Sequence, residues 1–535
     1  MNKFLLISAL TSILISSKAQ TLKEAIRLNE NEQQEAASVM YQLLISKDPA
    51  NGTNFYYYGE NLIDASNTDS AKIIFDKGLS VDPTNPLNII GQAELKLQLG
   101  LLSEAKPMID KAIQMGGGKN ARVLMEAAEA YIRYKKAQDL MSAEVYLDQA
   151  LKLEPKNPEI YNLMGDLYSE LNNGSVAAAK YNKALELDKT QVKALLHKGQ
   201  LYKRSTNYEG AAAEFENALK IDPNFAPAYR ELGEVSFMMK KIETAKGYYR
   251  QYLDLSKNNN SARLRYTYFL FTTENFKDGL VEFNNISTID SANLGMMRLG
   301  AYLNYENSDT TNAFAFINRV FANTASDTTK RITLDYAYYG KILAKAGQDS
   351  LGAMYIMRAI QLDSTKTDYY TDLGNLYSKA KKYPEAAMAY EKRIASGQKI
   401  VTADYYKLGL AYYQGKMYPQ ADSAFIKVTE IQETWPNGYL YRARTNSAMD
   451  PDTKQGLGKP FYEKYIELIT ADSVAFVKYK RELAESNRYL GYYYLVQKDC
   501  PQSIIYFKRT LEFDPDNVSA QEILESIKSN PKNFK

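Results

Sequence analysis

A pattern that returns every 34 residues constrains this chain more than any other feature. Asp-Pro or an equivalent breaker separates successive segments, and Pro49 and Pro83 lie 34 residues apart. Steps of the same length from Pro155 reach Lys189 and then Pro223. A fixed period of this size is typical of solenoids, in which each unit buries its apolar face against its neighbours. The 535 residues therefore predict one extended repeat array.

Each period reads as two amphipathic helices. The first half recurs as YNLMGDLY at 161–168 and YRELGEVS at 229–236, and the second half carries Ala177, Tyr181 and Ala184 or their equivalents. Apolar residues at i, i+3, i+4 and i+7 predict one buried face on each helix. Proline stops the second helix because it lacks the N–H that a continuing helix needs. Each unit is therefore expected to be a helical hairpin.

Glycine recurs in the middle of the first helix, as at Gly165, Gly199, Gly233 and Gly374. Glycine costs a helix about 1 kcal/mol relative to alanine, so a structural reason is needed to keep it. We expect the second helix of the hairpin to approach closely there, with a small residue such as Ala177 facing the glycine. Aromatic residues such as Tyr181 are expected to fill the gap between one hairpin and the next.

These residues resemble the tetratricopeptide repeat (TPR), in which Trp/Tyr-x2-Leu-Gly-x2-Tyr is followed by Ala, by Phe/Tyr-x2-Ala and by Pro. The match is strong from about 49 to 291 and from 369 to 427, and weaker elsewhere. The resemblance implies an all-α superhelical solenoid of about 13–14 hairpins, whose first helices line a concave groove.

The match also predicts the organisation of the chain. Residues 20–290 form an N-terminal TPR array, 291–365 degenerate TPR-like hairpins, and 366–432 further TPR repeats. Residues 433–535 form degenerate C-terminal repeats with a long loop at 449–460 and a final capping helix.

The N-terminal 19 residues are expected to be a cleaved signal peptide. Lys3 precedes an apolar run at 4–15, and Ser17 and Ala19 provide small residues at the spacing that a signal peptidase accepts. The alternative is a membrane anchor, but this run is too short to cross about 30 Å of hydrocarbon. With its Tyr/Asn/Lys-rich composition, the chain looks like periplasmic TPR proteins of Bacteroidota. We therefore expect export to the periplasm or the periplasmic face of the outer membrane, without a transmembrane helix in the mature chain.

Composition argues against several functions. Removal of Lys3 and Lys18 from the 66 basic residues leaves 64 against 63 acidic residues, so no net field would attract nucleic acid. Cys500 is the one cysteine and His197 the one histidine. No phosphate-binding loop, Cys-x2-Cys pair or nucleophile motif is present. We predict a protein that is not an enzyme, has no cofactor and has no metal site.

The candidate binding residues follow from the resemblance, by counting from the glycine to positions that face the groove. Early in the chain this selects polar residues, including Asn162 and Asp166, and later it selects aromatic residues. The partner-binding candidates are Lys193, Lys203, Arg204, Arg230, Tyr268, Phe271, Arg298, Tyr302, Tyr305, Tyr406, Tyr413 and Arg488. The arginines could instead pair with nearby acids, and the tyrosines could simply pack between hairpins.

Two functions remain open. The first is a non-catalytic scaffold or adaptor of the cell envelope that binds a partner protein or peptide in the groove. The resemblance connects such proteins with outer-membrane secretion, motility or uptake assemblies. The alternative is a glycan- or peptidoglycan-binding accessory protein, because tyrosine rings stack on sugars.

Overall fold

The computed structural model describes residues 21–134, 137–256, 259–286, 293–471 and 473–529. The expected signal peptide lies outside these residues. The described residues form helices and contain no strand, which confirms the predicted all-α solenoid. The chain divides into two compact units, residues 1–289 and 290–535, and each is considered separately below.

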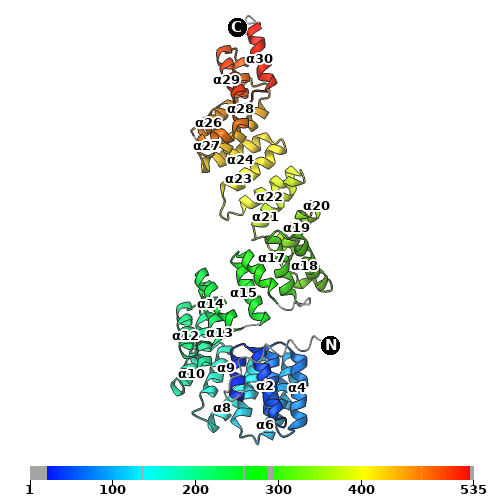
Figure 1. Ribbon diagram of the computed structural model, residues 1–535, viewed down its shortest axis with the longest axis vertical. Helices are drawn as coiled ribbons and strands as arrows, with labels where there is room; N and C mark the ends of the chain where they lie inside the picture. Colours follow the sequence, from blue (N-terminus) through cyan, green and yellow to red (C-terminus); the bar gives the residue numbers. More distant parts are fainter. Residues whose placement is uncertain (1–20, 135–136, 257–258, 287–292, 472, 530–535) are drawn as a thin grey trace, which may run out of the picture. The chain divides into compact units, whose positions relative to one another are not determined.

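The first unit stacks eight hairpins, coloured from blue to green in Figure 1. Their helices are α1 (Leu22–Glu30) and α2 (Gln34–Lys47), α3 (Gly52–Asp64) and α4 (Thr68–Val81), α5 (Leu87–Gln98) and α6 (Leu102–Met115), α7 (Ala121–Tyr134) and α8 (Ala137–Leu153), α9 (Pro158–Glu170) and α10 (Gly174–Leu187), α11 (Val192–Arg204) and α12 (Tyr208–Ile221), α13 (Ala226–Met238) and α14 (Ile242–Leu255), and α15 (Asn260–Thr272) and α16 (Phe276–Asn284).

The second unit adds six hairpins. They are α17 (Leu294–Glu306) and α18 (Thr310–Asn323), α19 (Thr333–Lys345) and α20 (Asp349–Leu362), α21 (Asp368–Lys379) and α22 (Tyr383–Ala395), α23 (Thr402–Gln414) and α24 (Tyr418–Ile431), α25 (Pro436–Met449) and α26 (Lys459–Thr470), and α28 (Lys480–Val496) and α29 (Cys500–Phe513). A 3₁₀ turn (Thr328–Lys330), the short α27 (Ser473–Lys478) and the final α30 (Val518–Ser529) complete it.

In most of the described hairpins, the turn between the two helices uses one residue in the left-handed conformation. In the α9–α10 hairpin this is Asn172, with φ of 57°, and the next amide, on Asn173, donates to the carbonyl of Tyr168 at 2.8 Å. This is the hydrogen bond that ends a helix in a Schellman motif. Ser66 and Thr206 hold the same place with φ of 60°. A fixed turn of this kind sets the same hairpin angle in successive repeats.

The mid-helix glycines make room for aromatic rings. A Cβ placed on Gly165 would lie 2.3 Å from a ring carbon of Tyr181 in the same hairpin. The ring of Phe75 lies against Gly59 of its own hairpin and Gly91 of the next. The expectation that the glycine faces a small residue is therefore wrong, because the aromatic side chain, and not the alanine, occupies the space above the glycine.

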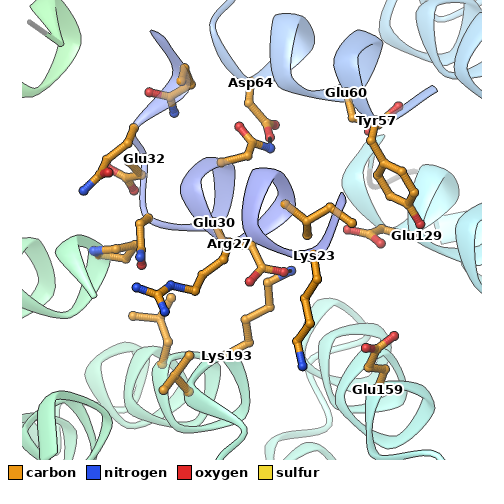
Figure 2. Close-up of a pocket in the computed structure, with 18 of the residues that line it drawn as sticks. Lys23, Arg27, Glu30, Glu32, Tyr57, Glu60, Asp64, Glu129, Glu159 and Lys193 are labelled. Atoms are coloured by element: carbon orange, nitrogen blue, oxygen red, sulfur yellow. Dashed lines mark hydrogen bonds and ion pairs between the residues drawn. The ribbon is translucent and has the colours of Figure 1, made fainter. Parts of the chain in front are cut away.

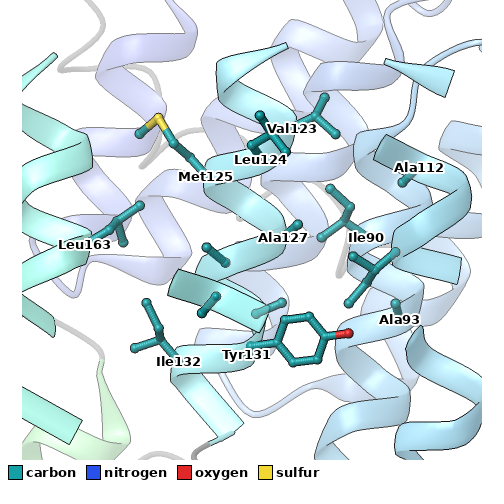
Figure 3. Close-up of a cluster of buried hydrophobic side chains, with 14 of the residues drawn as sticks. Ile90, Ala93, Ala112, Val123, Leu124, Met125, Ala127, Tyr131, Ile132 and Leu163 are labelled. Carbon is teal, nitrogen blue, oxygen red and sulfur yellow. The ribbon is translucent and has the colours of Figure 1, made fainter. Parts of the chain in front are cut away.

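Burial continues from hairpin to hairpin. In the first unit, Ile90 and Ala93 of α5 belong to the same buried cluster as Leu124 and Tyr131 of α7, and Leu163 of α9 extends this cluster (Figure 3). Each buried aliphatic side chain contributes about 1.5–3 kcal/mol relative to exposure. The hairpins therefore stabilise each other, and their first helices are held in a row.

The long loop after α25 is compact. The buried carboxylate of Asp450 accepts the backbone N–H groups of Gln455 and Gly456 at 3.0 and 2.7 Å. The N–H of Gly458 donates to the hydroxyl of Tyr489 at 3.0 Å. These bonds tie the loop to α28.

Candidate functional site: an acidic cavity in the first unit

The first unit contains a cavity of about 2030 Å³ on the side of its first helices. Residues of the first helices α1, α3, α5, α7, α9, α11, α13 and α15 line it, together with residues of α2, α12 and α14, so every hairpin of the first unit contributes its first helix. Figure 2 shows α1 with Lys23, Arg27 and Glu30 directed toward the neighbouring first helices. Lys193 reaches from α11 toward Glu30, and their Nζ and Oε1 atoms lie 2.8 Å apart.

The first hairpin closes the cavity by contacting hairpins about 200 residues later in the chain. Glu32, in the turn between α1 and α2, lies 3.2 Å from a guanidinium nitrogen of Arg230. The same carboxylate accepts the hydroxyl of Tyr252, and the Asn259 amide donates to the Glu32 carbonyl at 3.1 Å. The array of the first unit therefore curves until its beginning meets its later hairpins.

Carboxylates predominate among the charged side chains that line the cavity. Twelve acidic residues face seven basic ones, and His197 is the one histidine among them. The acidic residues are Glu30, Glu32, Glu35, Glu60, Asp64, Asp82, Glu126, Glu129, Glu159, Asp166, Asp188 and Asp222, and the basic ones are Lys23, Arg27, Arg122, Arg133, Lys193, Arg230 and Arg265. The lining therefore carries a net negative charge.

One guanidinium, that of Arg133, lies close to four carboxylates. Nη1 of Arg133 lies 2.6 Å from Glu94 and 3.1 Å from Glu60, and the side chain also approaches Asp64 and Glu129 at 3.8 Å. Burial is the largest cause that raises the pKa of both Glu60 and Glu94. The negative charge of Glu94 further raises the pKa of Glu60. A single cation thus compensates four carboxylates incompletely.

A second buried carboxylate lies nearby on α7. Glu126 accepts the hydroxyls of Tyr56 and Tyr57 at 2.9 and 3.1 Å, and Arg122 lies 3.4 Å away. Burial, assisted by the charge of Glu129, raises the pKa of Glu126 to about 7. The protonation of Glu126 therefore changes near neutral pH.

Several buried oxygen atoms of the lining have no hydrogen-bond partner among the described residues. They are the side-chain oxygens of Asn29, Asn31 and Asn162 and one oxygen of Glu60. Asn31 and Asn162 are only 2% and 6% exposed. An unmade hydrogen bond at a buried acceptor costs about 1–3 kcal/mol. These oxygens are therefore unpaired acceptors buried in the wall of the cavity.

His197 lies on α11 and contacts α9 of the preceding hairpin. Its Nδ1 is 2.6 Å from Asp166 Oδ1, and the same oxygen accepts the Tyr181 hydroxyl at 2.8 Å. Burial lowers the pKa of His197, but the charge and hydrogen bond of Asp166 outweigh this effect and the net shift is upward. Within the described part of the chain, no group of three or more acidic, His or Cys side chains is arranged to hold a metal ion.

Two of the predicted binding residues line this cavity and are already paired. Lys193 contacts Glu30, and Arg230 contacts Glu32 and Glu231. Asn162 and Asp166, selected by the same counting, also line it. Counting helix positions from the repeated glycine therefore identified some of the residues that line the cavity.

Two other predicted cations lie outside the cavity lining. Lys203 contacts Glu231 and, at 2.7 Å, Glu234. Arg204 lies 3.5 Å from Glu170. Both cations stabilise contacts between neighbouring hairpins.

The two predicted aromatic residues of α15, Tyr268 and Phe271, differ in their surroundings. Phe271 packs against Phe276, with ring centroids 5.8 Å apart. Tyr268 is 39% exposed. Neither residue lines the cavity.

In the second unit, Arg298 and Tyr302 surround a buried carboxylate. Arg298 contacts both oxygens of Asp335 at 2.8 and 2.9 Å, and the hydroxyl of Tyr302 donates to the same group. Asp335 is fully buried, and it also accepts the Ile332 amide at 2.9 Å near the start of α19. In this arrangement the two predicted residues join α17 to α19.

Two further tyrosines of the second unit pack against other rings. Tyr305 lies edge-on to Tyr338, and Lys345 lies over its ring at 4.6 Å. Tyr406 packs edge-on against Trp435, with centroids 4.8 Å apart. These contacts match the packing alternative for both residues, and the glycan hypothesis stays a prediction.

Tyr413 and Arg488 lie together. Both line a smaller hollow of the second unit, between α23, α25, α26 and α28. This is the one place where an aromatic and a cationic candidate of the second unit share a pocket lining among those described here.

The sequence did not reveal the carboxylates and the arginine of α7. Glu126, Glu129 and Arg133 belong to a helix, Ala121–Tyr134, that contains no glycine from which to count. The closing contact at Glu32 was missed as well, because it depends on how far the array curves. The signal that could have found α7 is its position one period before α9.

Comparisons with known proteins agree with the repeat. Two models described as "Tetratricopeptide repeat" match residues 132–191 and 192–225. The search of curated proteins finds no significant match. No described helix combines the length and apolar character needed for a membrane span.

Solved structures with similar chains include the C-terminal part of a TPR repeat-containing protein from Cytophaga hutchinsonii. It is 37% identical, covers 48% of this chain and 98% of its own, and has a TM-score of 0.42. A tetratricopeptide repeat protein from Parabacteroides merdae is 20% identical, with coverages of 48% and 98% and a TM-score of 0.33. PilF of Pseudomonas aeruginosa is 21% identical, with coverages of 39% and 99% and a TM-score of 0.31.

Proposed function

Because this chain belongs to the tetratricopeptide-repeat family, we propose that it is an interaction scaffold whose acidic cavity binds a lysine- or arginine-bearing segment of a partner protein. Repeats of this family generally form interaction surfaces. The segment would lie along the first helices of the first unit. Its cations would approach the carboxylates that line the cavity.

The excess of carboxylates in the cavity lining is the observation that carries this proposal. The exposed side chains Glu129 and Glu159 are 41% and 49% accessible, so a partner can reach them. Charge complementarity also speeds association, since opposite potentials steer a partner toward the cavity.

We place this scaffold in the cell envelope, bound to a protein of a secretion, motility or uptake assembly. The pattern of residues 1–19 supports this placement. Protein purified from its native cells tests it directly, because a signal peptide cleaved after Ala19 leaves Gln20 as the first residue. An intact Met1 or Asn2 in the mature protein would contradict export by this route.

Binding is tested with fluorescently labelled hexalysine and the full chain, by fluorescence anisotropy at low and at physiological salt. We expect binding that weakens with salt, because the attraction is ionic and partly exposed. The double substitution Glu129→Gln, Glu159→Gln should weaken binding about tenfold, which corresponds to about 1.4 kcal/mol. Hexaglutamine with the same label should not bind.

The matched control changes two exposed carboxylates outside the cavity, Glu216→Gln and Glu243→Gln, on the second helices α12 and α14. This variant has the same net charge as the cavity variant. Equal weakening in both variants would mean that the overall field attracts hexalysine, and the cavity would lose its role. No hexalysine binding at low salt would contradict the proposed function.

A further inference from the structure

A second hollow, of about 470 Å³, lies within the second unit. Its wall combines two arginines, Arg444 and Arg488, with Glu485 and the tyrosines Tyr413, Tyr462 and Tyr492. The volume falls within the range of small-ligand pockets, so it can hold one or two side chains of a partner. Two cations face one anion, so this hollow has the opposite charge to the cavity of the first unit.

Glu485 is engaged by its neighbours. Arg444 contacts it through two nitrogens, at 2.8 and 2.6 Å. The hydroxyl of Tyr462 donates to it at 3.2 Å. This bidentate pair neutralises Arg444 and uses both oxygens of Glu485. The carboxylate therefore makes no ion pair with Arg488, which follows it by one helical turn.

Arg488, in contrast to Arg444, has no carboxylate paired with it in the described part of the chain. Its side chain is exposed and makes no ion pair or hydrogen bond within the described ranges. A guanidinium carries five N–H donors in a planar fork that matches a carboxylate. The hydroxyls of Tyr413 and Tyr492 likewise make no hydrogen bond to another described residue, and they line the same hollow. The unpaired groups here are donors.

The aromatic walls are held in place before any ligand arrives. Tyr489 packs against Tyr462 with centroids 4.7 Å apart, and its hydroxyl accepts the Gly458 amide. The ring of Tyr492 rests edge-on against buried Phe507 at 5.2 Å. Fixed rings lower the entropic cost of binding, because few rotamers are lost.

We propose that this hollow binds an aspartate or glutamate side chain from an acidic segment of a partner protein. The carboxylate would accept from Arg488 and from the hydroxyls of Tyr413 and Tyr492. The tyrosine rings would cover the aliphatic part of the side chain. This inference rests on the proposed scaffold function and adds a second, separate contact of opposite charge.

The test uses fluorescently labelled hexaglutamate with the full chain, again by anisotropy, with hexaglutamine as the neutral peptide. Arg488→Ala should weaken hexaglutamate binding at least tenfold and leave hexalysine binding unchanged. Arg358→Ala is the matched control, because it removes an exposed arginine of the second unit away from the hollow. Tyr492→Phe, which retains the ring, should weaken hexaglutamate binding about threefold.

Equal losses in Arg488→Ala and Arg358→Ala would overturn the site. So would tight binding of hexaglutamine, or full competition by inorganic phosphate at the peptide concentration, since a simple anion would then suffice. Loss of hexalysine binding in the cavity variant, with hexaglutamate binding retained, separates the two proposals. Failure of hexaglutamate alone contradicts only this one.

Discussion

The two units build concave surfaces from the same hairpin and give them opposite chemistry. In the first unit, charged side chains pair with each other across hairpins, and the atoms left over are acceptors, as at Asn162. In the second unit, four of the eight residues that line the hollow are tyrosines, and the charged group left without a partner among the described residues is the donor Arg488. The comparison teaches that the repeat fixes where side chains stand, while the pairing among neighbours decides which of them can serve a partner.

Among the changes that test this difference between the two units, removal of Arg133 should have the largest effect on stability. Arg133→Ala leaves buried Glu60 and Glu94 without their counter-charge, and the loss of one partner of a buried ion pair costs about 3–5 kcal/mol. Hydrogen exchange followed by mass spectrometry should report faster exchange in α3, α5 and α7. Arg488→Ala, the corresponding change in the second unit, should alter stability by less than about 0.5 kcal/mol. Similar effects of the two substitutions would remove the distinction between paired and open arginines.

An effect of intermediate size should come from pH. The folded state raises the pKa of Glu126 to about 7, so it holds a proton that the unfolded chain releases above its ordinary value near 4.5. The stability that Glu126 contributes is therefore full below about pH 4.5 and is lost as the pH rises to about 7. The original chain should therefore lose about 3 kcal/mol of stability across this pH range in urea unfolding, and Glu126→Gln should abolish this loss.

Glu129→Gln is the control for the pH experiment. This side chain lies on the same helix but is 41% exposed. Because the charge of Glu129 helps to raise the pKa of Glu126, the Glu129→Gln variant should keep the pH-dependent loss of stability but complete it at a lower pH than the original chain. If Glu126→Gln also keeps it, the protonation of Glu126 does not contribute to the stability of the first unit.

The smallest effect is expected at the closing contact. Glu32→Gln keeps an oxygen for Tyr252 but removes the charge that Arg230 faces, at a cost of about 1 kcal/mol. Exchange should increase in α1, α2 and the start of α15, and remain unchanged in α28. Glu35→Gln alters an exposed cavity carboxylate beside it and should leave exchange in α1 unchanged. Unaltered exchange in Glu32→Gln would show that burial alone closes the first unit.

The sequence predicted the fold well because the residues that define each repeat lie within one hairpin. Gly165 and Tyr181 each have a geometric role inside one hairpin, and the equivalent residues recur at a fixed distance in other hairpins. The reason given for the glycine was wrong, since spacing alone does not say which side chain fills the gap. Tyr181, two turns from the start of its helix, covers the glycine.

The site was only partly predictable. Counting within a hairpin reached Lys193 and Arg230, which line the cavity, but it could not say that Glu30 and Glu32 from the first hairpin would meet them. Those contacts depend on small rotations that accumulate over several repeats. Arg298 was selected for the same kind of position, and only the fold shows Asp335 beside it.

The contact between Glu32 and Asn259 also fixes a sequence of events during synthesis. The two residues are 227 positions apart, so the cavity has no complete wall until the ribosome has made most of the first unit. At 5–20 residues per second, roughly 10–45 s pass between the two ends of that contact. Until then, the first hairpin lacks part of the contacts that it makes in the folded unit. A nascent chain stalled before Asn259 would therefore leave the first hairpin, with Glu30 and Glu32, without the last of the contacts that close the cavity in the finished unit.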